Sequence, residues 1–357
     1  MAPSKCLVIG GGGNLGGHIV RMLLERGAKT VASYDLVPFN GTEQAVQSFV
    51  GNISNFESLV AAMQGMDAVF HTASIIDIRP IPSPKMREVN VDGTRTVIEA
   101  CKAAKVGILV YTSSLEVVSG VSQDGTVLNI DGVDESAPIP YAHHLPYATT
   151  KAAAEELVLA AHSPEVLRTV SVRPGYIQGP GSIGLRVEMV RAKTRSDYYV
   201  TAKVPAKIST VHPRNAALAH ILAADRISEP DVGGQSFFIR DFEANVVDMA
   251  LTAFQNTPIK PVILPLLLAY VIAWILDRVD RILHKFAALR GTTHQTSDEV
   301  LDIRAVSMAY IDIIVSSGRA KRVLGYTPLV SEAECMQDAA RWCEKFYASE
   351  GTKKKQT

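Results

Sequence analysis

From Lys5 to about Pro174, short apolar runs alternate with segments in which apolar residues recur at spacings of three and four. The short runs predict strands and the longer segments predict helices. Strands are expected at Cys6–Ile9, Thr30–Asp35, Ala68–His71, Ile108–Thr112 and Thr169–Val172. Helices are expected at Asn14–Arg26, Phe56–Gln64, Pro84–Ala104 and Tyr147–His162. This alternation predicts an α/β fold with a parallel sheet covered on both faces, and a ligand site beyond the carboxyl ends of the strands.

The pattern is less regular after Pro180, where a smaller substrate lobe is expected. Its predicted strands are Ile208–Val211 and Ser236–Ile239, and its predicted helices are Arg214–Arg226 and Asn245–Gln255. The tail ends in another helix-period stretch, Glu332–Tyr347. The predicted divisions are a nucleotide-binding domain at 1–180, the lobe at 181–257, an apolar and amphipathic insert at 258–290, a segment packing on the lobe at 291–350 and a basic tail at 351–357.

The insert begins with Val262–Leu276, fifteen residues without a charge, followed by the amphipathic segment Asp277–Arg290. As a helix, Val262–Leu276 would reach about 22 Å, which is short for a hydrocarbon core of about 30 Å. If the tail packs on the catalytic lobe, both ends of the insert lie on one side of a membrane. We therefore expect a monotopic dip or hairpin with the amphipathic part at the interface. A buried core helix joined to a surface helix is the alternative.

Composition narrows the class of protein. The chain has 357 residues, 36 Lys+Arg against 36 Asp+Glu, and 47% apolar residues, so neither disorder nor charge-driven nucleic-acid binding is expected. The four cysteines lack CxxC spacing, which predicts buried, reduced thiols and no metal site. No secretory leader is indicated, so the amino-terminal part is expected on the cytosolic side. Lys354-Lys355-Gln356-Thr357 resembles a dilysine signal for retrieval to the endoplasmic reticulum.

A glycine run connects the first predicted strand to the first predicted helix. Gly10 would permit a tight turn, Gly13 would let the backbone approach a pyrophosphate, and Gly16 would let the helix pack on the strand. The helix then begins at Asn14 and Leu15, whose free N–H groups favour an anion. Although a flexible loop is the alternative, strand, glycines and helix in this order predict a Rossmann nucleotide site.

Asp35 lies about twenty residues further on, at the end of the second predicted strand. A carboxylate there can accept both hydrogen bonds of an adenosine ribose and would repel a 2′-phosphate. Leu36 follows instead of an arginine, so NAD is predicted over NADP. An acid that only forms a turn is the alternative.

Tyr147 and Lys151 are four residues apart at the start of a predicted helix, so they share one face. Ser114 follows the fifth predicted strand, at the edge where a parallel sheet presents ligands. An ammonium group near the phenol would stabilise the phenolate, and a serine hydroxyl could hold the substrate oxygen. Together they would remove an alcohol proton as a hydride leaves for a nicotinamide. A solvated surface Tyr and Lys is the alternative.

These motifs resemble those of an extended short-chain dehydrogenase/reductase of the 3β-hydroxysteroid dehydrogenase branch, over nearly the whole chain. The resemblance also rests on the runs Asp67–Ser74, Asn90–Thr94, Tyr111–Val117, Arg173–Pro180, Ser236–Asp241 and Val323–Val330.

The resemblance implies specific roles. Ser114 matches the catalytic serine, Tyr147 the acid/base, and Lys151 the residue that binds the nicotinamide ribose and tunes the phenol. Asn52 and Ile53 stand where the family contacts adenine, and Pro174 is expected beside the cofactor. Asn52 replaces the family's usual Asp there, and an amide can still hydrogen-bond adenine.

The resemblance implies NAD-dependent oxidation of the 3β-hydroxyl group of a sterol or steroid. The dilysine-like end together with the apolar insert predicts a location in the endoplasmic reticulum membrane, with the catalytic domain facing the cytosol. The branch includes enzymes acting on sterols with a 4α-carboxylate, whose β-keto acid product loses carbon dioxide without a further catalytic acid. Members that also isomerise a double bond carry two adjacent acids, whereas this chain has Asp241-Phe242; a coupled isomerase is therefore an alternative only. A non-steroid alcohol or ketone as substrate, and a non-catalytic NAD-sensing membrane protein, also remain open. A sterol and a membrane surface are the expected partners, with a homodimer left open.

Overall fold

A computed structural model of the chain describes residues 3–41, 45–77, 84–124, 128, 130–143, 145–289 and 311–353. The chain forms two compact units. The first contains Met1–Ile177, Ser209–Phe242 and Ile314–Glu332, and the second contains Gln178–Ile208, Glu243–Ile313 and Ala333–Thr357. Residues 209–242, which the sequence analysis assigns to a substrate lobe, thus belong to the first unit.

The first unit is built on a seven-stranded parallel sheet in the order β13-β9-β5-β4-β1-β2-β3. The strands are β1 (Lys5–Ile9), β2 (Thr30–Asp35), β3 (Val46–Val50), β4 (Ala68–His71), β5 (Ile108–Thr112), β9 (Arg168–Pro174) and β13 (Ser236–Ile239). Strand order reverses between β1 and β4, the position at which such sheets bind ligands. The predicted parallel sheet is confirmed, with two edge strands added: β3, which was not predicted, and β13, which was predicted in the substrate lobe.

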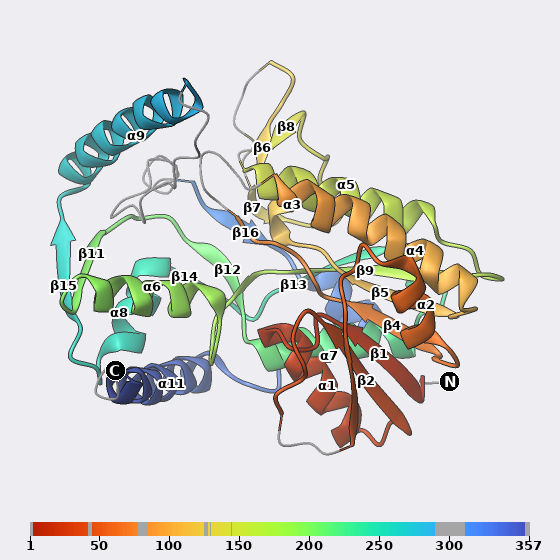
Figure 1. Ribbon diagram of the computed structural model, residues 1–357. Coiled ribbons are helices and arrows are strands. Elements are labelled where there is room, and N and C mark those ends of the chain that lie inside the picture. Colours follow the sequence, from red (N-terminus) through yellow and green to blue (C-terminus); the bar gives the residue numbers. More distant parts are fainter. Residues whose placement is uncertain are drawn as a thin grey trace. The chain divides into compact units, whose positions relative to one another are not determined.

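Helices cover both faces of this sheet (Figure 1). Along β1, Cys6 and Val8 join the core on the side of α1 and α7, whereas Leu7 and Ile9 join the core on the side of α2 and α4. This alternation follows from the two-residue period of a strand. The helices are α1 (Asn14–Glu25), α2 (Phe56–Met63), α4 (Gly93–Ala103), α5 (Pro146–Ala160) and α7 (Pro213–Asp225). The helix predicted at Pro84–Ala104 is α3 (Lys85–Arg87), the π-helical turn η1 (Glu88–Asp92) and α4 in succession.

Shorter elements complete the first unit and its edges. The 3₁₀ turn η2 (Leu115–Val118) follows β5, and the π-helical turn η3 (Ala320–Leu324) lies in the carboxyl-terminal part of the chain. A second sheet orders β10-β12-β16-β7, with β14 paired to β12, and β6 pairs β8. Their bounds are β6 (Gly120–Val121), β7 (Ile130–Val133), β8 (Ala142–His143), β10 (Tyr176–Ile177), β12 (Ile208–Val211), β14 (Phe242–Ala244) and β16 (Ile313–Val315).

The second unit has its own core, formed by two helices, a strand and the carboxyl-terminal helix. Met189, Tyr199, Phe254 and Cys343 are buried together there. The elements of this unit are α6 (Ile183–Thr194), β11 (Tyr198–Ala202), α8 (Val246–Phe254), β15 (Lys260–Leu264), α9 (Leu266–Leu289) and α11 (Glu332–Lys353). All four cysteines of the chain are buried thiols outside any disulfide, as predicted.

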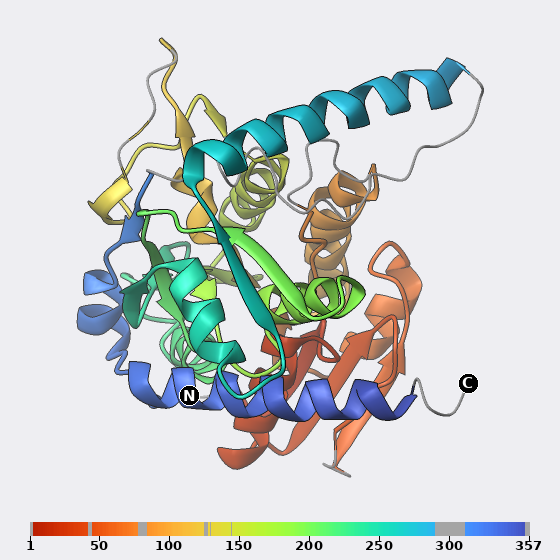
Figure 2. The same ribbon diagram turned by 90° about the vertical axis from the view of Figure 1, so that its left-hand side faces the viewer.

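The expected helix across Val262–Leu276 is wrong in its first part. Residues 260–264 form β15, which pairs in parallel with β11, and the helix begins only at Leu266 (Figure 2). Pro265 explains the boundary, because a residue before proline favours an extended backbone and proline is tolerated at a helix start. The helix then runs unbroken to Leu289, so the segment is neither a hairpin nor a pair of helices. Within the described residues, no helix is long and apolar enough to cross a membrane.

Candidate active site

The glycine turn lies at the carboxyl end of β1 and opens α1. Gly10 has a φ of +84°, and a Cβ there would lie 2.6 Å from Thr72 Oγ1, so this position requires glycine. A Cβ on Gly16 would collide with the carbonyl oxygen of Gly10. Gly13 caps the helix without a side-chain hydrogen bond. The first N–H groups of α1, from Asn14 and Leu15 onward, therefore point past a turn without side chains, which suits a pyrophosphate.

Asp35 ends β2 and faces this turn. Its Oδ2 accepts the N–H of Gly12 at 3.0 Å, and its Oδ1 accepts the N–H of Leu36 at 2.6 Å. Each carboxylate oxygen has a second lone pair for a ribose hydroxyl. The glycine turn without side chains, the start of α1 without a side-chain cap and the carboxylate of Asp35 together suit the binding of a dinucleotide. Asp35 and the glycines are thus brought together as the sequence predicts.

The remaining expected cofactor residues lie at the same edge of the sheet. Asn52 and Ile53 follow β3; Asn52 Oδ1 accepts the N–H of Ser54, and the Asn52 carbonyl accepts the hydroxyl of Tyr34. Ile53 is buried in the core with α4. Pro174 is the last residue of β9. Their contacts to a nucleotide stay a prediction.

Tyr147 and Lys151 lie one turn apart on α5, and both are nearly inaccessible to solvent, with 9% and 2% exposure. The hydroxyls of Ser114 and Ser74 lie near enough to the phenol of Tyr147 to lower its pKa. Lys151 Nζ instead donates to the carbonyl oxygen of Thr112 and lies 4.3 Å from the centre of the Tyr111 ring. The ammonium group of Lys151 is therefore held at the end of β5, while the hydroxyl of Ser114 lowers the pKa of the phenol.

Burial controls the charges of both groups. It raises the pKa of Tyr147 above the usual value for a phenol, and the charge of Glu116 raises that pKa further, while the hydroxyls of Ser114 and Ser74 lower it. Burial lowers the pKa of Lys151 to about 7, although the nearby charge of Glu155 opposes this shift. The phenol is thus protonated near neutral pH, ready to donate a proton to a ketone oxygen. To act as a base, it must first lose that proton.

Ser74 and Glu116, which the sequence analysis did not single out, also affect the pKa of Tyr147. Ser74 follows β4 by three residues and Glu116 follows β5 by four, so both belong to the edge that carries Ser114. Their position after neighbouring parallel strands was the available signal. Among the described residues, no group of His, Cys, Asp and Glu side chains could hold a metal ion.

Asn90, in the π-helical turn η1, is hydrogen-bonded to two elements that carry site residues. Its side chain accepts the N–H of Ile75, donates to the carbonyl of Ile75, and donates to Thr150 Oγ1 on α5 at 3.0 Å. The extra residue of a π-helical turn is a common way to aim one side chain at a functional site. Asn90 thereby joins the loop that holds Ser74 to the helix that holds Tyr147.

Comparison with known proteins identifies the relatives of the chain. Residues 7–258 match the 3-beta hydroxysteroid dehydrogenase/isomerase family. The chain is 32% identical to 3 beta-hydroxysteroid dehydrogenase type 7 of Mus musculus, over 96% of both chains. It is also 32% identical to the sterol-4-alpha-carboxylate 3-dehydrogenase, decarboxylating, of Mus musculus, over 93% of this chain and 89% of the relative.

Solved structures share the fold. MoeE5 in complex with UDP-glucuronic acid and NAD superposes with a TM-score of 0.70 at 22% identity, covering 96% of this chain and 99% of that one. The dTDP-glucose 4,6-dehydratase DesIV of Streptomyces venezuelae, with NAD and TYD bound, gives a TM-score of 0.70 at 19% identity, covering 96% and 97%. At these identities the likeness establishes the Rossmann-type fold alone.

Proposed function

The chain belongs to the 3-beta hydroxysteroid dehydrogenase/isomerase family, and on that premise we propose that it oxidises the 3β-hydroxyl group of a sterol or steroid to the ketone. It is an oxidoreductase that uses NAD. The observation that carries the proposal is the pair of buried side chains Tyr147 and Lys151, one turn apart on α5, with Lys151 Nζ donating to the carbonyl oxygen of Thr112 at the carboxyl end of β5. The same edge of the sheet also carries the glycine turn and Asp35.

The proposed roles follow from the contacts. Ser114 would hold the substrate oxygen, and Tyr147 would take the hydroxyl proton during oxidation or supply it during reduction. Lys151, anchored by Thr112, would bind the nicotinamide ribose. Bound NAD supplies the acceptor for the hydride that leaves the carbinol carbon. The burial of Tyr147 and Lys151 excludes water from this exchange.

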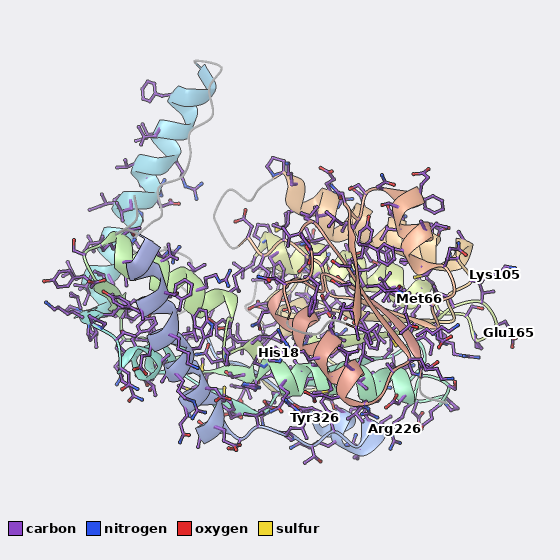
Figure 3. All side chains as sticks on the ribbon, turned by 60° about the horizontal axis from the view of Figure 1, so that its bottom comes forward. His18, Met66, Lys105, Glu165, Arg226 and Tyr326 are labelled. Carbon is purple, nitrogen blue, oxygen red and sulfur yellow. The ribbon has the colours of Figure 1, made fainter. Side chains whose placement is uncertain are left out.

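Decarboxylation is the finer proposal for a sterol with a 4α-carboxylate. Oxidation places a ketone beside the carbon that carries the carboxylate. The electrons of the breaking C–C bond can then delocalise onto the ketone oxygen as an enolate, and carbon dioxide leaves. No further acid is required, which agrees with the surroundings of Asp241. This carboxylate accepts hydrogen bonds from the N–H of His212, the amide of Asn215 and the hydroxyl of Tyr326, and Phe242 follows it. Tyr326 is labelled in Figure 3.

We also propose that α9 attaches the enzyme to a membrane surface, on the endoplasmic reticulum with the catalytic domain in the cytosol. Its small residues Ala269 and Ala273 are fully buried against Ala202, whereas its large apolar residues are exposed. The exposed residues are Leu267, Leu268, Tyr270, Val271, Trp274, Ile275, Val279, Ile282, Leu283 and Phe286. A water-insoluble substrate would be collected from such a surface. The expected dilysine signal, Lys354-Lys355, lies outside the described residues.

The test is turnover by the purified full chain with NAD and either a 4α-carboxysterol or a Δ5-3β-hydroxysteroid, with products identified by mass. We expect a ketone from both, with carbon dioxide from the first. Tyr147→Phe is expected to lower kcat by about a hundredfold or more, because general acid/base catalysis typically contributes at least that much.

Each contrary result has a definite meaning. A conjugated enone from the second substrate would support the isomerase. Turnover of neither sterol, with oxidation of a sugar nucleotide or flavonoid instead, would refute the steroid assignment. Unchanged activity of Tyr147→Phe would refute the site.

A further inference from the structure

His220 is a buried histidine on α7 that the mechanism above does not use. Its side chain is inaccessible to solvent, and both ring nitrogens have partners. Nδ1 lies 2.7 Å from the carbonyl oxygen of Ala216, and Nε2 lies 2.8 Å from Thr112 Oγ1. A carbonyl oxygen only accepts hydrogen bonds, so Nδ1 carries the proton of the neutral ring. Nε2 is therefore an acceptor, and the hydroxyl of Thr112 donates to it.

The ring of His220 is neutral at physiological pH. Burial lowers the pKa of His220 to about 4; the carbonyl oxygen of Ala216 opposes this shift, and the positive charge of Lys151 adds to it. A neutral ring has one N–H, and Ala216 accepts it. His220 therefore presents a fixed acceptor to the hydroxyl of Thr112.

Thr112 connects His220 to Lys151 through the sheet. It is the last residue of β5, and the pairing of β5 with β4 ends one residue earlier, at His71↔Tyr111. The carbonyl oxygen of Thr112 accepts from Lys151 Nζ, which comes from α5. The hydroxyl of Thr112 points to α7 on the opposite face of the sheet. One residue thus joins a buried hydrogen bond on one face to the ammonium group on the other.

The peptide between Thr112 and Ser113 is restrained in two directions. In the plane of the sheet, the N–H of Ser113 donates to the carbonyl oxygen of Val172 on β9 at 2.7 Å. Across the sheet, the hydroxyl of Thr112 is tied to His220 on α7. The bond in the plane still allows the end of the strand to bend toward α5, and the bond to His220 restrains that bending.

Packing alone does not account for a polar pair at this position. α7 contacts the sheet through small apolar residues, and Ala216, Ala217 and Ala223 are fully buried there. Replacing both partners of a buried hydrogen bond by apolar groups of the same shape costs little stability. A hydroxyl and an imidazole between these alanines therefore call for another explanation. The carbonyl oxygen of Thr112, which Lys151 uses, provides one.

We propose that His220 is a positioning residue: by accepting the hydroxyl of Thr112, it fixes the carbonyl oxygen that holds the ammonium group of Lys151. His220 touches neither substrate nor cofactor in this role. The proposal rests on the proposed function, in which Lys151 binds the nicotinamide ribose. Without the bond to His220, the ammonium group loses a fixed acceptor and meets the ribose in a less favourable position.

The test is NAD affinity, measured by calorimetric titration in a double-mutant cycle of His220→Phe and Lys151→Met. His220→Phe removes the acceptor and should weaken NAD binding by about tenfold, the size of a hydrogen bond to a charged group. In the Lys151→Met background, the same substitution should change NAD affinity by less than about twofold, because the group that it positions is absent. Equal losses in both backgrounds indicate a structural role and overturn the proposal, as does wild-type affinity of His220→Phe.

Milder variants separate the hydrogen bond from the shape of the ring. His220→Gln keeps an acceptor oxygen and should retain NAD affinity within about threefold. Thr112→Val keeps the shape of threonine without its hydroxyl and should reproduce the loss, so it decides if His220→Phe does not fold. Wild-type affinity of Thr112→Val overturns the proposal.

The matched control is His162→Phe, which also breaks a bond from a histidine ring in the first unit. His162 Nδ1 accepts the N–H of Thr169 at 3.1 Å, near the start of β9 and beyond the end of α5. This edge of the sheet is opposite the one that carries Thr112. His162→Phe should therefore keep wild-type NAD affinity, and a tenfold loss there would overturn the specific role of His220.

Nitrogen NMR of the wild-type protein tests the direction of the hydrogen bond without any variant. With nine histidines in the chain, selective labelling resolves the ring of His220, which should be protonated at Nδ1 and bare at Nε2. A ring protonated at Nε2 cannot accept the hydroxyl of Thr112 and overturns the proposal. These measurements use no sterol. Failure of the sterol to turn over would refute the proposed function and leave the role of His220 in NAD binding to be decided by the cycle.

Discussion

At the residue scale, the carboxylate of Asp35 links the end of β2 to the glycine turn. One oxygen accepts the N–H of Gly12 and the other accepts the N–H of Leu36. A phosphate on the 2′-hydroxyl of a bound nucleotide would approach this negative charge. Like charges placed together cost several kcal/mol, which is the physical basis for a preference for NAD.

Replacing Asp35 with alanine is therefore expected to narrow the preference for NAD over NADP by about tenfold or more, since about 1.4 kcal/mol corresponds to tenfold. Calorimetric titration with both nucleotides measures the ratio. Asp131→Ala on β7, an exposed acid, is the control and should keep the wild-type ratio. If the ratio is unchanged in Asp35→Ala, this residue does not select the cofactor.

The spacing of residues in the sequence identifies some of the residues around the site but not others. A spacing of four on α5 correctly puts Tyr147 and Lys151 on one face, but it does not reveal that Thr112 holds the ammonium group. Ser74 and Glu116 could not be found by spacing, because their approach to Tyr147 depends on which strands are neighbours. Motif runs contained both residues, yet a run does not say which of its side chains affects the phenol of Tyr147.

At the scale of elements, α5 is fastened to β9 by a buried ion pair. Arg173 Nε donates to Glu155 Oε2 at 3.0 Å, and Ser171 Oγ donates to the same carboxylate. Both charged side chains are nearly inaccessible, at 6% and 4% exposure. Because Glu155 also raises the pKa of Lys151, the tether connects packing to the charge in the site.

Replacing Glu155 with glutamine should lower the free energy of unfolding by about 3 to 5 kcal/mol, because it leaves the buried Arg173 charge without its ion-pair partner. Urea denaturation followed by circular dichroism measures the change. Glu99→Gln, which breaks only an exposed pair with Lys102, should cost at most about 1 kcal/mol. Equal effects of the two substitutions would contradict a stabilising role for the tether.

Helices and strands with a clear hydrophobic period were predicted well. Strands that form because of the strand beside them were not. β2, β4, β5, β12 and β13 have the predicted bounds. β3 was missed because most of its residues are exposed at the edge of the sheet. β15 was predicted as helix because apolar content alone does not distinguish a strand from a helix. Its strand state depends on pairing with β11, from Tyr198↔Lys260 to Ala202↔Leu264.

At the scale of the whole molecule, neither compact unit is one continuous stretch of the chain. The chain enters the second unit three times, at Gln178, Glu243 and Ala333. A linear reading assigns consecutive ranges to domains, so it cannot detect that 209–242 and 314–332 return to the first unit. The contacts that draw Ile314–Glu332 into that unit include Tyr326 with Asp241 and Asn215 with the backbone of Leu329 and Val330.

The surface of the second unit is unusual in α9, where alanines are buried and large apolar side chains are exposed. A helix in contact with water normally shows the reverse distribution, and an apolar surface of this kind marks an interaction site. Arg278 lies 5.3 Å from the Trp274 ring, and Arg281 is paired with Asp277. Cationic and aromatic groups side by side are typical of helices at a lipid interface. A bilayer surface therefore fits α9.

The double substitution Trp274→Glu and Ile282→Glu should abolish binding to phospholipid vesicles, measured by flotation. In the wild type both apolar side chains would move from water into the acyl chains, whereas a glutamate carboxylate would stay in water. It should not change NAD affinity, since both residues are exposed and lie outside the nucleotide-binding unit. Val166→Glu is the matched control, an exposed apolar residue of the first unit, and should bind vesicles like the wild type. If the α9 variant still floats with vesicles, the membrane contact lies elsewhere and the proposed role of α9 is refuted. If the wild type does not float, the monotopic proposal fails while the dehydrogenase proposal remains, because no residue of the proposed catalytic site is part of α9.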